Sequence, residues 1–281
     1  MLIFSKIGGL TMGDQEILLS KEKETLLGPL YCRARETKKE DPIFEDKKAL
    51  EIFEKMKYDF SKIKMPEKSC ITLVIRADKI DQYVREFIAD KKQVTIINLG
   101  VGLDNRYGRV NPCNAVWYEL DFLEVIELRK KFYQKPDNVH YISSSVTDLK
   151  WINQVNSTGE ILIVAEGLFM YLKEKKLKEL LLKLHKRFPG ANLVFDAYST
   201  YTVKNISKHV FLRKTKAEIF WGIDDPKQLE KWGEGIQFKE EWFFTEYEDI
   251  KRLSFFYRLA FKAAGLSKIA RQAHRILYYK I

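Results

Sequence analysis

The feature that most constrains the fold is an apolar strand that runs into a glycine turn and is followed by a second strand with acidic residues at its end. The first strand and turn occupy residues 96–106 and contain Gly100 and Gly102, and the second strand, residues 117–121, ends at Asp121. An acidic residue about 20 positions after the first glycine is the spacing of a nucleotide-binding βαβ unit. We therefore expect an α/β fold with a ligand over the carboxyl ends of parallel strands.

From residue 94 onward, apolar runs of strand length alternate with amphipathic helical patterns. The predicted strands are residues 94–99, 116–120, 139–142, 161–165, 191–196 and 274–281, and the predicted helices are residues 122–133, 173–188 and 253–264, the last capped by Gly265. The run 161–165 is continuously apolar, which is typical of a strand buried on both faces. This alternation predicts a doubly wound, mostly parallel sheet.

The first third of the chain reads as a helical extension of this sheet. Residues 1–92 carry helical patterns from about residue 14, with Asp41-Pro42 as a helix start and an apolar stripe over residues 71–88. Residues 93–197 form the half of the domain that we expect to bind the ligand. The whole chain, residues 1–281, is expected to be a single domain.

The strand and helix rhythm breaks at residues 198–246, which are rich in aromatic side chains. Trp221, Trp232 and Trp242 lie in this insertion. Two interpretations stay open: the insertion is a lid over the carboxyl edge of the sheet, or its aromatic side chains are the core of a helical insertion. Residues 247–281 then return to a helix and strands.

Composition and charge exclude several classes of protein. The chain is 46% hydrophobic and carries a net charge of +10, but its basic residues alternate with acidic ones, which is typical of solvated helix faces. No apolar stretch approaches the ~20 residues of a membrane span, and the N-terminus lacks the pattern of a signal peptide, so we expect a cytoplasmic protein. The three cysteines have no CxxC spacing, which predicts reduced thiols and no metal site.

The glycine turn lacks one element of a dinucleotide fingerprint. A third glycine is expected near Asn105, and its absence disfavours a pyrophosphate and therefore an NAD-dependent oxidoreductase. An adenosine without phosphates fits better, with Asp121 accepting hydrogen bonds from the ribose hydroxyls. Glu119 points to the same side of its strand and competes for this role, and Asp121 could instead cap the helix that follows.

Two further turns belong to the same edge of the predicted sheet. Glu166 stands beside Gly167 at the end of the run 161–165, and a polar segment, residues 143–151, follows the third predicted strand. Because the carboxyl ends of parallel strands meet at one edge, these turns and the glycine turn should rim one crevice.

The combined motifs resemble the leucine carboxyl methyltransferase family, which includes the polyketide O-methyltransferases of the tetracenomycin type. The matching segments are residues 98–106, 119–121 and 165–172, with Asn105 in place of the usual threonine and Leu123 in place of a frequent proline. The resemblance covers roughly residues 30–200. It implies a Rossmann-like, seven-stranded sheet and S-adenosyl-L-methionine as the cofactor.

The resemblance also implies which residues hold the cofactor. They are Arg76, Gly100, Gly102, Asp121, Ser145, Val146 and Glu166. Arg76 would pair with the methionyl carboxylate or with the acceptor, and Arg33 and Arg35 would close over the site. Ser145 and Val146 stand where the family usually has aspartate and leucine, and Asp148 is a possible substitute for that aspartate.

The expected reaction is methyl transfer to the oxygen of a carboxylate or phenol on a small molecule or a protein C-terminus. A carboxylate is already ionised at neutral pH, whereas a phenol, with a pKa near 10, needs a general base. None of the four histidines lies in a recognisable motif, so the sequence names no base. The alternative is a nucleic-acid-binding protein or RNA methyltransferase on the same fold, motivated by the charge of +10.

Overall fold

The computed structural model describes residues 10–12, 15–17, 23–112, 114–206 and 217–281. The strands are β1 (Leu10–Met12), β2 (Gln15–Ile17), β3 (Val94–Leu99), β4 (Ala115–Asp121), β5 (Val139–Ser143), β6 (Glu160–Ala165), β7 (Asn192–Tyr198), β8 (Gln237–Phe243) and β9 (His274–Lys280). The α-helices are α1 (Leu27–Thr37), α2 (Lys47–Lys55), α3 (Glu67–Ala89), α4 (Arg106–Val110), α5 (Leu123–Phe132), α6 (Glu174–Arg187), α7 (Thr200–Ile206), α9 (Phe255–Leu266) and α10 (Lys268–Arg271). Short 3-10 helices connect them, namely η1 (Lys23–Leu26), η2 (Phe60–Lys62), η3 (Leu149–Gln154), η4 (Phe169–Tyr171), η5 (Pro226–Trp232), η6 (Phe244–Glu246) and η7 (Glu248–Arg252).

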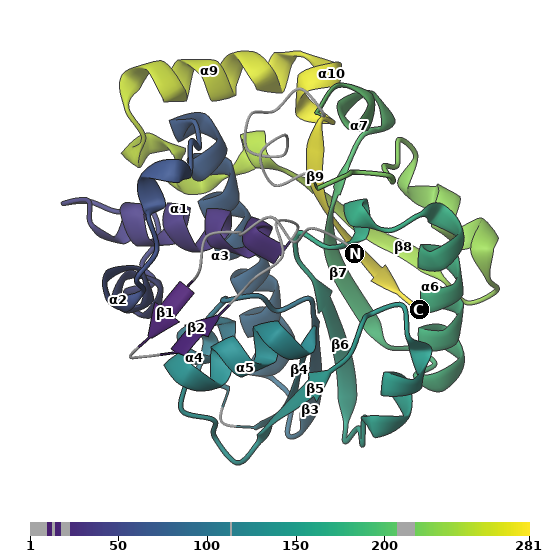
Figure 1. Ribbon diagram of the computed structural model, residues 1–281. Helices are drawn as coiled ribbons and strands as arrows, with labels where there is room; N and C mark the ends of the chain where they lie inside the picture. Colours follow the sequence, from purple (N-terminus) through teal and green to yellow (C-terminus); the bar gives the residue numbers. More distant parts are fainter. Residues whose placement is uncertain (1–9, 13–14, 18–22, 113, 207–216) are drawn as a thin grey trace, which may run out of the picture.

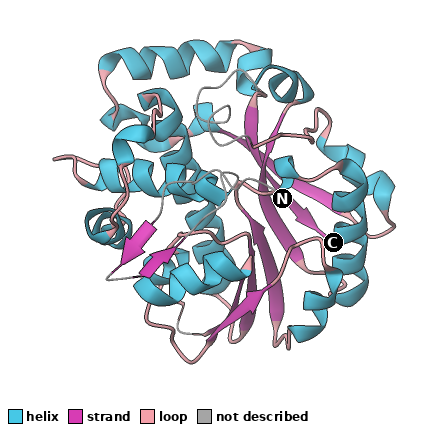
Figure 2. Cartoon of the chain, viewed as in Figure 1, coloured by secondary structure: helices cyan, strands magenta, loops and turns pink. Residues whose placement is uncertain are grey.

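A seven-stranded sheet forms the centre of the molecule, in the order β5-β4-β3-β6-β7-β9-β8 (Figures 1 and 2). β3, β4, β5, β6 and β7 are parallel, and β9 is antiparallel to both β7 and β8. The chain adds β4 and β5 on one side of β3 and then β6 and β7 on the other. The strand order therefore reverses beside β3, and in such a sheet ligands bind outside the carboxyl ends at that point.

Helices cover both faces of the sheet, as Figure 1 shows for α3 and α6. On α6 the buried residues are Leu177, Leu180, Leu181 and Leu184, the spacing that places one apolar stripe against a sheet. The side chains of α6 share a core with Ile97 and the alternate residues of the central strands. α3 buries its own stripe against the opposite face. A third core joins α1, α2 and η2 to α5, so the N-terminal extension packs onto the sheet domain.

The structure confirms the predicted mostly parallel α/β sheet and corrects several boundaries at its flanks. α2 begins at Lys47 rather than after Asp41-Pro42, because the Asp46 carboxylate caps it by accepting a hydrogen bond from Ala49 N at 2.9 Å. α9 continues through Gly265 to Leu266, so that glycine is no cap. β2 lies where helices were expected. The insertion holds β8 as an edge strand, which the sequence analysis missed.

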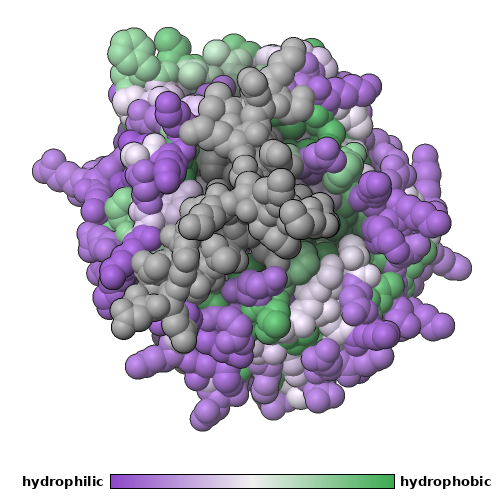
Figure 3. Space-filling model, viewed as in Figure 1, coloured by the Kyte–Doolittle hydropathy of each residue, from purple (hydrophilic) through white to green (hydrophobic). Residues whose placement is uncertain are grey.

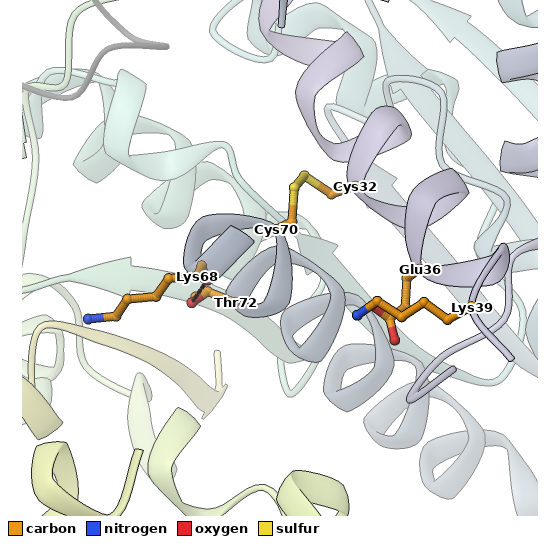
Figure 4. The surroundings of a disulfide bond; sticks show 6 residues. All are labelled: Cys32, Glu36, Lys39, Lys68, Cys70 and Thr72. Atoms are coloured by element: carbon orange, nitrogen blue, oxygen red, sulfur yellow. Dashed lines mark hydrogen bonds and ion pairs between the residues drawn. A yellow bond between two sulfur atoms is a disulfide. The ribbon is translucent and has the colours of Figure 1, made fainter. Parts of the chain in front are cut away.

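The cysteines also differ from the expectation of reduced thiols. Cys32 on α1 and Cys70 on α3 form a disulfide bond, with their Cα atoms 4.8 Å apart (Figure 4). Both are buried where α1 packs on α3. Spacing along the sequence could not reveal this pair, because the two residues are 38 positions apart and meet only through helix packing. The third cysteine, Cys113, lies outside the described residues.

The surface view in Figure 3 is mostly hydrophilic, with apolar side chains gathered over α9 at the top. Phe255, Phe256, Leu259 and Leu266 of this helix are exposed. No helix in the described part of the chain has the length and apolar character needed to cross a membrane.

Candidate cofactor and methyl-transfer site

Two glycines shape the turn that leaves β3. Gly100 and Gly102 have φ values of 65° and 53°, a left-handed backbone that L side chains adopt at a cost. A Cβ at Gly100 would lie 3.0 Å from Leu168 Cδ1. Gly100 N donates to Leu120 O at 2.8 Å, which ties the turn to the neighbouring strand. The turn is thus a close backbone cradle at the point where the strand order reverses.

Asp121 lies at the end of β4 beside this turn. Its Oδ2 accepts a hydrogen bond from Gly102 N, and its Oδ1 accepts one from Phe122 N, both at 2.8 Å. Asp121 is half-buried and is the last residue of β4, so it lies at the carboxyl edge of the sheet. Its bond to Phe122 N shows that it also helps to start α5, so the capping interpretation and a ligand contact are compatible.

Glu119, the competing acidic residue, faces the interior. It is 2% exposed and accepts hydrogen bonds from Arg129 Nη2 and Nε at 2.5 and 3.1 Å. Burial raises the pKa of Glu119, against the effect of Arg129, which lowers it. Arg129 also donates to Gly102 O at 2.9 Å and Asp104 O at 2.8 Å. The Glu119–Arg129 pair therefore holds the backbone of the glycine turn through hydrogen bonds from Arg129. Asp121 is the acidic side chain of β4 that lies at the edge of the sheet.

The turn after β5 brings Ser145 and Val146 to the same edge. Ser145 Oγ bonds Thr147 Oγ1 at 2.9 Å, and Val146 O accepts a hydrogen bond from Trp151 Nε1 at 3.1 Å. Asp148 accepts a hydrogen bond from Lys150 N at 3.3 Å and caps η3. This capping role gives Asp148 a local structural task in the turn.

Glu166 and Asp196 meet at the ends of β6 and β7, with Arg76 between them. Arg76 Nε donates to Glu166 Oε1 and its Nη1 to Asp196 Oδ2, both at 3.0 Å. Gly167 has a φ of 62°, and a Cβ there would lie 3.1 Å from Arg76 Nη2. This close approach explains the glycine after Glu166. Arg76 is 5% exposed, so it acts on the edge chiefly by fixing these two carboxylates.

The same carboxylates belong to a larger buried ion network. Its members are Arg33, Arg76, Arg106 and Arg109 with Asp46, Asp81, Asp104, Glu166 and Asp196. Arg106 donates to Asp81 and to Glu166, and therefore links α3 to the end of β6. Burial raises the pKa of Asp196 and Asp104, but neighbouring arginines outweigh it and hold both well below the ordinary range. Both are ionised at pH 7.

His274 joins this network from the first residue of β9. Its Nε2 lies 2.7 Å from Asp196 Oδ2. The centre of its ring lies 4.4 Å from the ring centres of both Tyr198 and Phe244. Sequence reasoning included Asp104 and Arg106 only in the matching segment 98–106, and it gave no role in the site to Asp81, Asp196 or His274. No local motif reveals His274, because it reaches Asp196 only through the antiparallel pairing of β9 with β7.

The tryptophans of the insertion pack in the interior. Trp221 is 3% exposed and belongs to the core on the α6 face, where the half-buried Trp232 also packs. Trp242 on β8 lies in the core on the α3 face. These positions support the core interpretation for the three side chains. Arg33 Nη2 donates to Leu103 O at 2.9 Å, so Arg33 supports the glycine turn from the extension.

The arrangement suits a cofactor with an adenosine and a charged amino acid end. The glycine cradle leaves room for a close backbone approach, Asp121 supplies acceptors for a diol, and the Glu166 region supplies paired charges. No group of three or more potential metal ligands occurs among the described side chains. The fold is therefore that of a doubly wound α/β protein, and this edge of the sheet is its candidate ligand site.

Comparison with known proteins assigns the family. Residues 27–185 match the leucine carboxyl methyltransferase family, and the chain belongs to it. The chain is 32% identical to the tetracenomycin polyketide synthesis O-methyltransferase TcmP of Streptomyces glaucescens, over 95% of this chain and 99% of that protein. It is 26% identical to the S-adenosyl-L-methionine-dependent methyltransferase dpfgK of Gibberella zeae, over 84% of this chain and 87% of the relative.

Solved structures agree with this assignment at the level of the fold. An S-adenosylmethionine-dependent methyltransferase from Anabaena variabilis aligns with a TM-score of 0.51 and 14% identity, over 73% of this chain and 84% of that one. The protein is a methyltransferase that uses S-adenosyl-L-methionine. A dinucleotide-dependent oxidoreductase is thereby excluded.

Proposed function

We propose that this enzyme transfers the methyl group of S-adenosyl-L-methionine to an oxygen atom of a carboxylate or phenolic hydroxyl. The observation that carries the proposal is the similarity along almost the whole chain to a relative named as a polyketide O-methyltransferase. The acceptor is a small molecule or the C-terminus of a protein. Because the cofactor carries its own electrophilic methyl group, the protein needs to align the acceptor oxygen and exclude water.

The cofactor site of this proposal comprises Arg76, Gly100, Gly102, Asp121, Ser145, Val146 and Glu166. Asp121 accepts hydrogen bonds from the ribose, and the two glycines let the backbone approach the adenosine. Glu166, held by Arg76, lies toward the methionyl end. What supports this division is that the carboxyl ends of β3 and β4 supply the cradle and the diol acceptor, while β6 supplies the charged end.

Calorimetry with S-adenosylmethionine and S-adenosylhomocysteine tests the site. Asp121→Asn should weaken binding by about 10- to 100-fold, because a hydrogen bond to a charged group contributes about 1.5–3 kcal/mol. Asp59→Asn is the matched control, since Asp59 caps η2 in the extension and should leave binding unchanged. Equal affinity of the Asp121→Asn variant and the unaltered enzyme would show that the ribose assignment is wrong.

The reaction is tested with S-adenosylmethionine labelled in its methyl group and an extract of small metabolites. Label in a methyl ester is released by mild alkali, whereas label in an aryl methyl ether is stable, and both products support transfer to oxygen. Label found on nitrogen or sulfur alone would contradict the proposal. RNA binding that falls steeply with salt, without affinity for either sulfur compound, would favour the nucleic-acid alternative.

A further inference from the structure

α9 presents large apolar side chains to solvent. Phe256 and Leu266 are 80% and 91% exposed, and Phe255 and Leu259 are exposed as well. A helix on the surface of a globular protein ordinarily turns its apolar stripe toward the core. Figure 3 shows these side chains as the green patch over α9 at the top of the molecule. An exposed apolar patch of this kind is typical of a surface that contacts another molecule.

The exposed side chains share one side of the helix. An α-helix has about 3.6 residues per turn, so Phe255, Leu259 and Leu266, at spacings of four and seven positions, lie in one line along it. Phe256 widens this line on one side. Phe261 is buried in the core on the α3 face and attaches α9 to the rest of the protein. The apolar face of α9 that points outward is therefore distinct from the residue that packs inward.

Basic side chains accompany this apolar face. Lys262 on α9 and Lys268 on α10 are exposed, and neither forms an ion pair within the described part of the chain. Arg271 on α10 pairs with Glu246 at 2.5 Å, and both partners of that pair are exposed. Residues 253–281 contain no aspartate or glutamate. The surface therefore combines exposed apolar side chains with positive charge that its own segment does not neutralise.

A lipid bilayer with anionic headgroups fits this combination. A helix with phenylalanine and leucine on one face and lysine beside them lies in the plane of the membrane interface. Its apolar side chains enter the boundary of the acyl chains, and its cations meet the anionic headgroups. A second copy of the chain fits less well, because like charges of the two basic segments would face each other. A nucleic acid needs cations at the centre of the contact, where α9 has leucine and phenylalanine.

We propose that α9 and α10 dock this enzyme on the surface of an anionic membrane. This binding function goes beyond the proposed methyl transfer and does not depend on the acceptor. α10 ends three residues before β9, whose first residue, His274, pairs with Tyr198 at the carboxyl end of β7. α10 therefore lies at the same end of the sheet as the candidate site, and docking brings that end close to the bilayer.

Sedimentation of the full chain with vesicles tests the docking surface. The vesicles consist of phosphatidylcholine alone or of equal parts of phosphatidylcholine and phosphatidylserine. The unaltered protein should bind the phosphatidylserine vesicles, and salt should weaken this binding because it screens exposed charges. Phe256→Ser together with Leu266→Ser should weaken it about 100-fold, because immersion of each apolar side chain contributes a factor of about 10 or more.

A pair of charge variants tests the electrostatic part. Lys262→Gln together with Lys268→Gln should weaken binding to the phosphatidylserine vesicles about 25-fold, roughly fivefold for each cation. Lys175→Gln together with Lys178→Gln is the matched control, because it removes the same charge from exposed positions on α6. This control should bind the vesicles as the unaltered protein does. Equal effects of the two charge variants would show that net charge, and not the α9 surface, binds the membrane, and would overturn the inference.

Affinity for S-adenosylhomocysteine separates docking from the proposed function. It should be the same in all of these variants, which shows that a loss of vesicle binding is no loss of the fold. Absence of sedimentation with phosphatidylserine vesicles, or equal sedimentation of the serine variant and the unaltered protein, would overturn the docking inference and leave methyl transfer intact. A dimer that the serine substitutions dissociate, or RNA binding by the basic segment, in place of vesicle binding would also overturn it.

Discussion

The disulfide between Cys32 and Cys70 should contribute strongly to stability, and its contribution can be calculated. Cross-linking two residues 38 positions apart removes loop entropy from the unfolded chain worth about 4 kcal/mol at 25 °C. Either Cys32→Ala or Cys70→Ala removes the bond completely. The double variant should therefore be little less stable than either single variant, with a coupling energy of about 4 kcal/mol in the double-mutant cycle.

Guanidinium unfolding without reductant measures the four free energies of this cycle. Cys113→Ala is the control and should not change the coupling between the other two positions. Addition of a thiol reductant should bring the unaltered protein close to the single variants. Additive losses in the cycle, or three alkylated thiols in protein unfolded without reductant, would refute the reasoning. The same alkylation on protein taken directly from cells tells whether the bond exists where the protein works.

Three further predictions concern the site. The first compares two glycines with left-handed backbones, Gly102 with a φ of 53° and Gly190 with a φ of 82°. Replacing either with alanine should lower the free energy of unfolding by about 1–2 kcal/mol. Only Gly102→Ala should weaken S-adenosylhomocysteine binding in calorimetry. Glu119→Gln should destabilise the fold by about 3–5 kcal/mol in urea unfolding, because it leaves Arg129 buried without its charged partner. The lowered pKa of His274 means that the unfolded chain binds a proton more readily below about pH 6.5. Stability should thus fall as the pH drops from 7 to 5, and His274→Gln should reduce that fall in urea unfolding at the two pH values.

The central sheet was predictable because its signals are local. The strand 94–99 coincides with β3, and the run 161–165 lies within β6. A continuous apolar run of strand length is typical of a strand that is buried on both faces of a sheet. The buried leucines of α6 recur every three or four residues, and this spacing within one segment predicts an amphipathic helix. The glycine turn follows β3, and Asp121 ends β4. Because β3 and β4 are parallel neighbours, both features lie at the same edge of the sheet, as their topology predicts.

The flanks were less predictable because tertiary contacts decide them. The sequence favoured a helix after Asp41-Pro42, but Ile43 N donates to Glu36 Oε1 and Ile43 O accepts a hydrogen bond from Tyr247. Glu36 belongs to the preceding helix and Tyr247 lies 204 positions away along the chain, and together they hold the segment in an irregular conformation up to the cap at Asp46. Among the strands that the structure describes, β8 pairs only with β9, and its mixed polar and aromatic sequence has no continuous apolar run that would predict a strand.

The ion network shows why the motifs could not be joined from sequence. Arg76 and Asp196 are 120 positions apart, and Arg106 and Glu166 are 60 apart. Each arginine alone reads as a surface residue. Their partners appear only when α3 packs on the sheet, which places charges of opposite sign together in the interior.

This network also changes the role of the N-terminal extension. Asp46, which caps α2, accepts hydrogen bonds from Arg33 and from Arg109 beyond the glycine turn. Arg33 in turn holds Leu103 O. A buried guanidinium that loses its carboxylate costs about 3–5 kcal/mol, so separation of the extension from the sheet would leave Arg109 poorly compensated and the turn without one of its supports. The extension is therefore part of the framework that fixes the glycine turn.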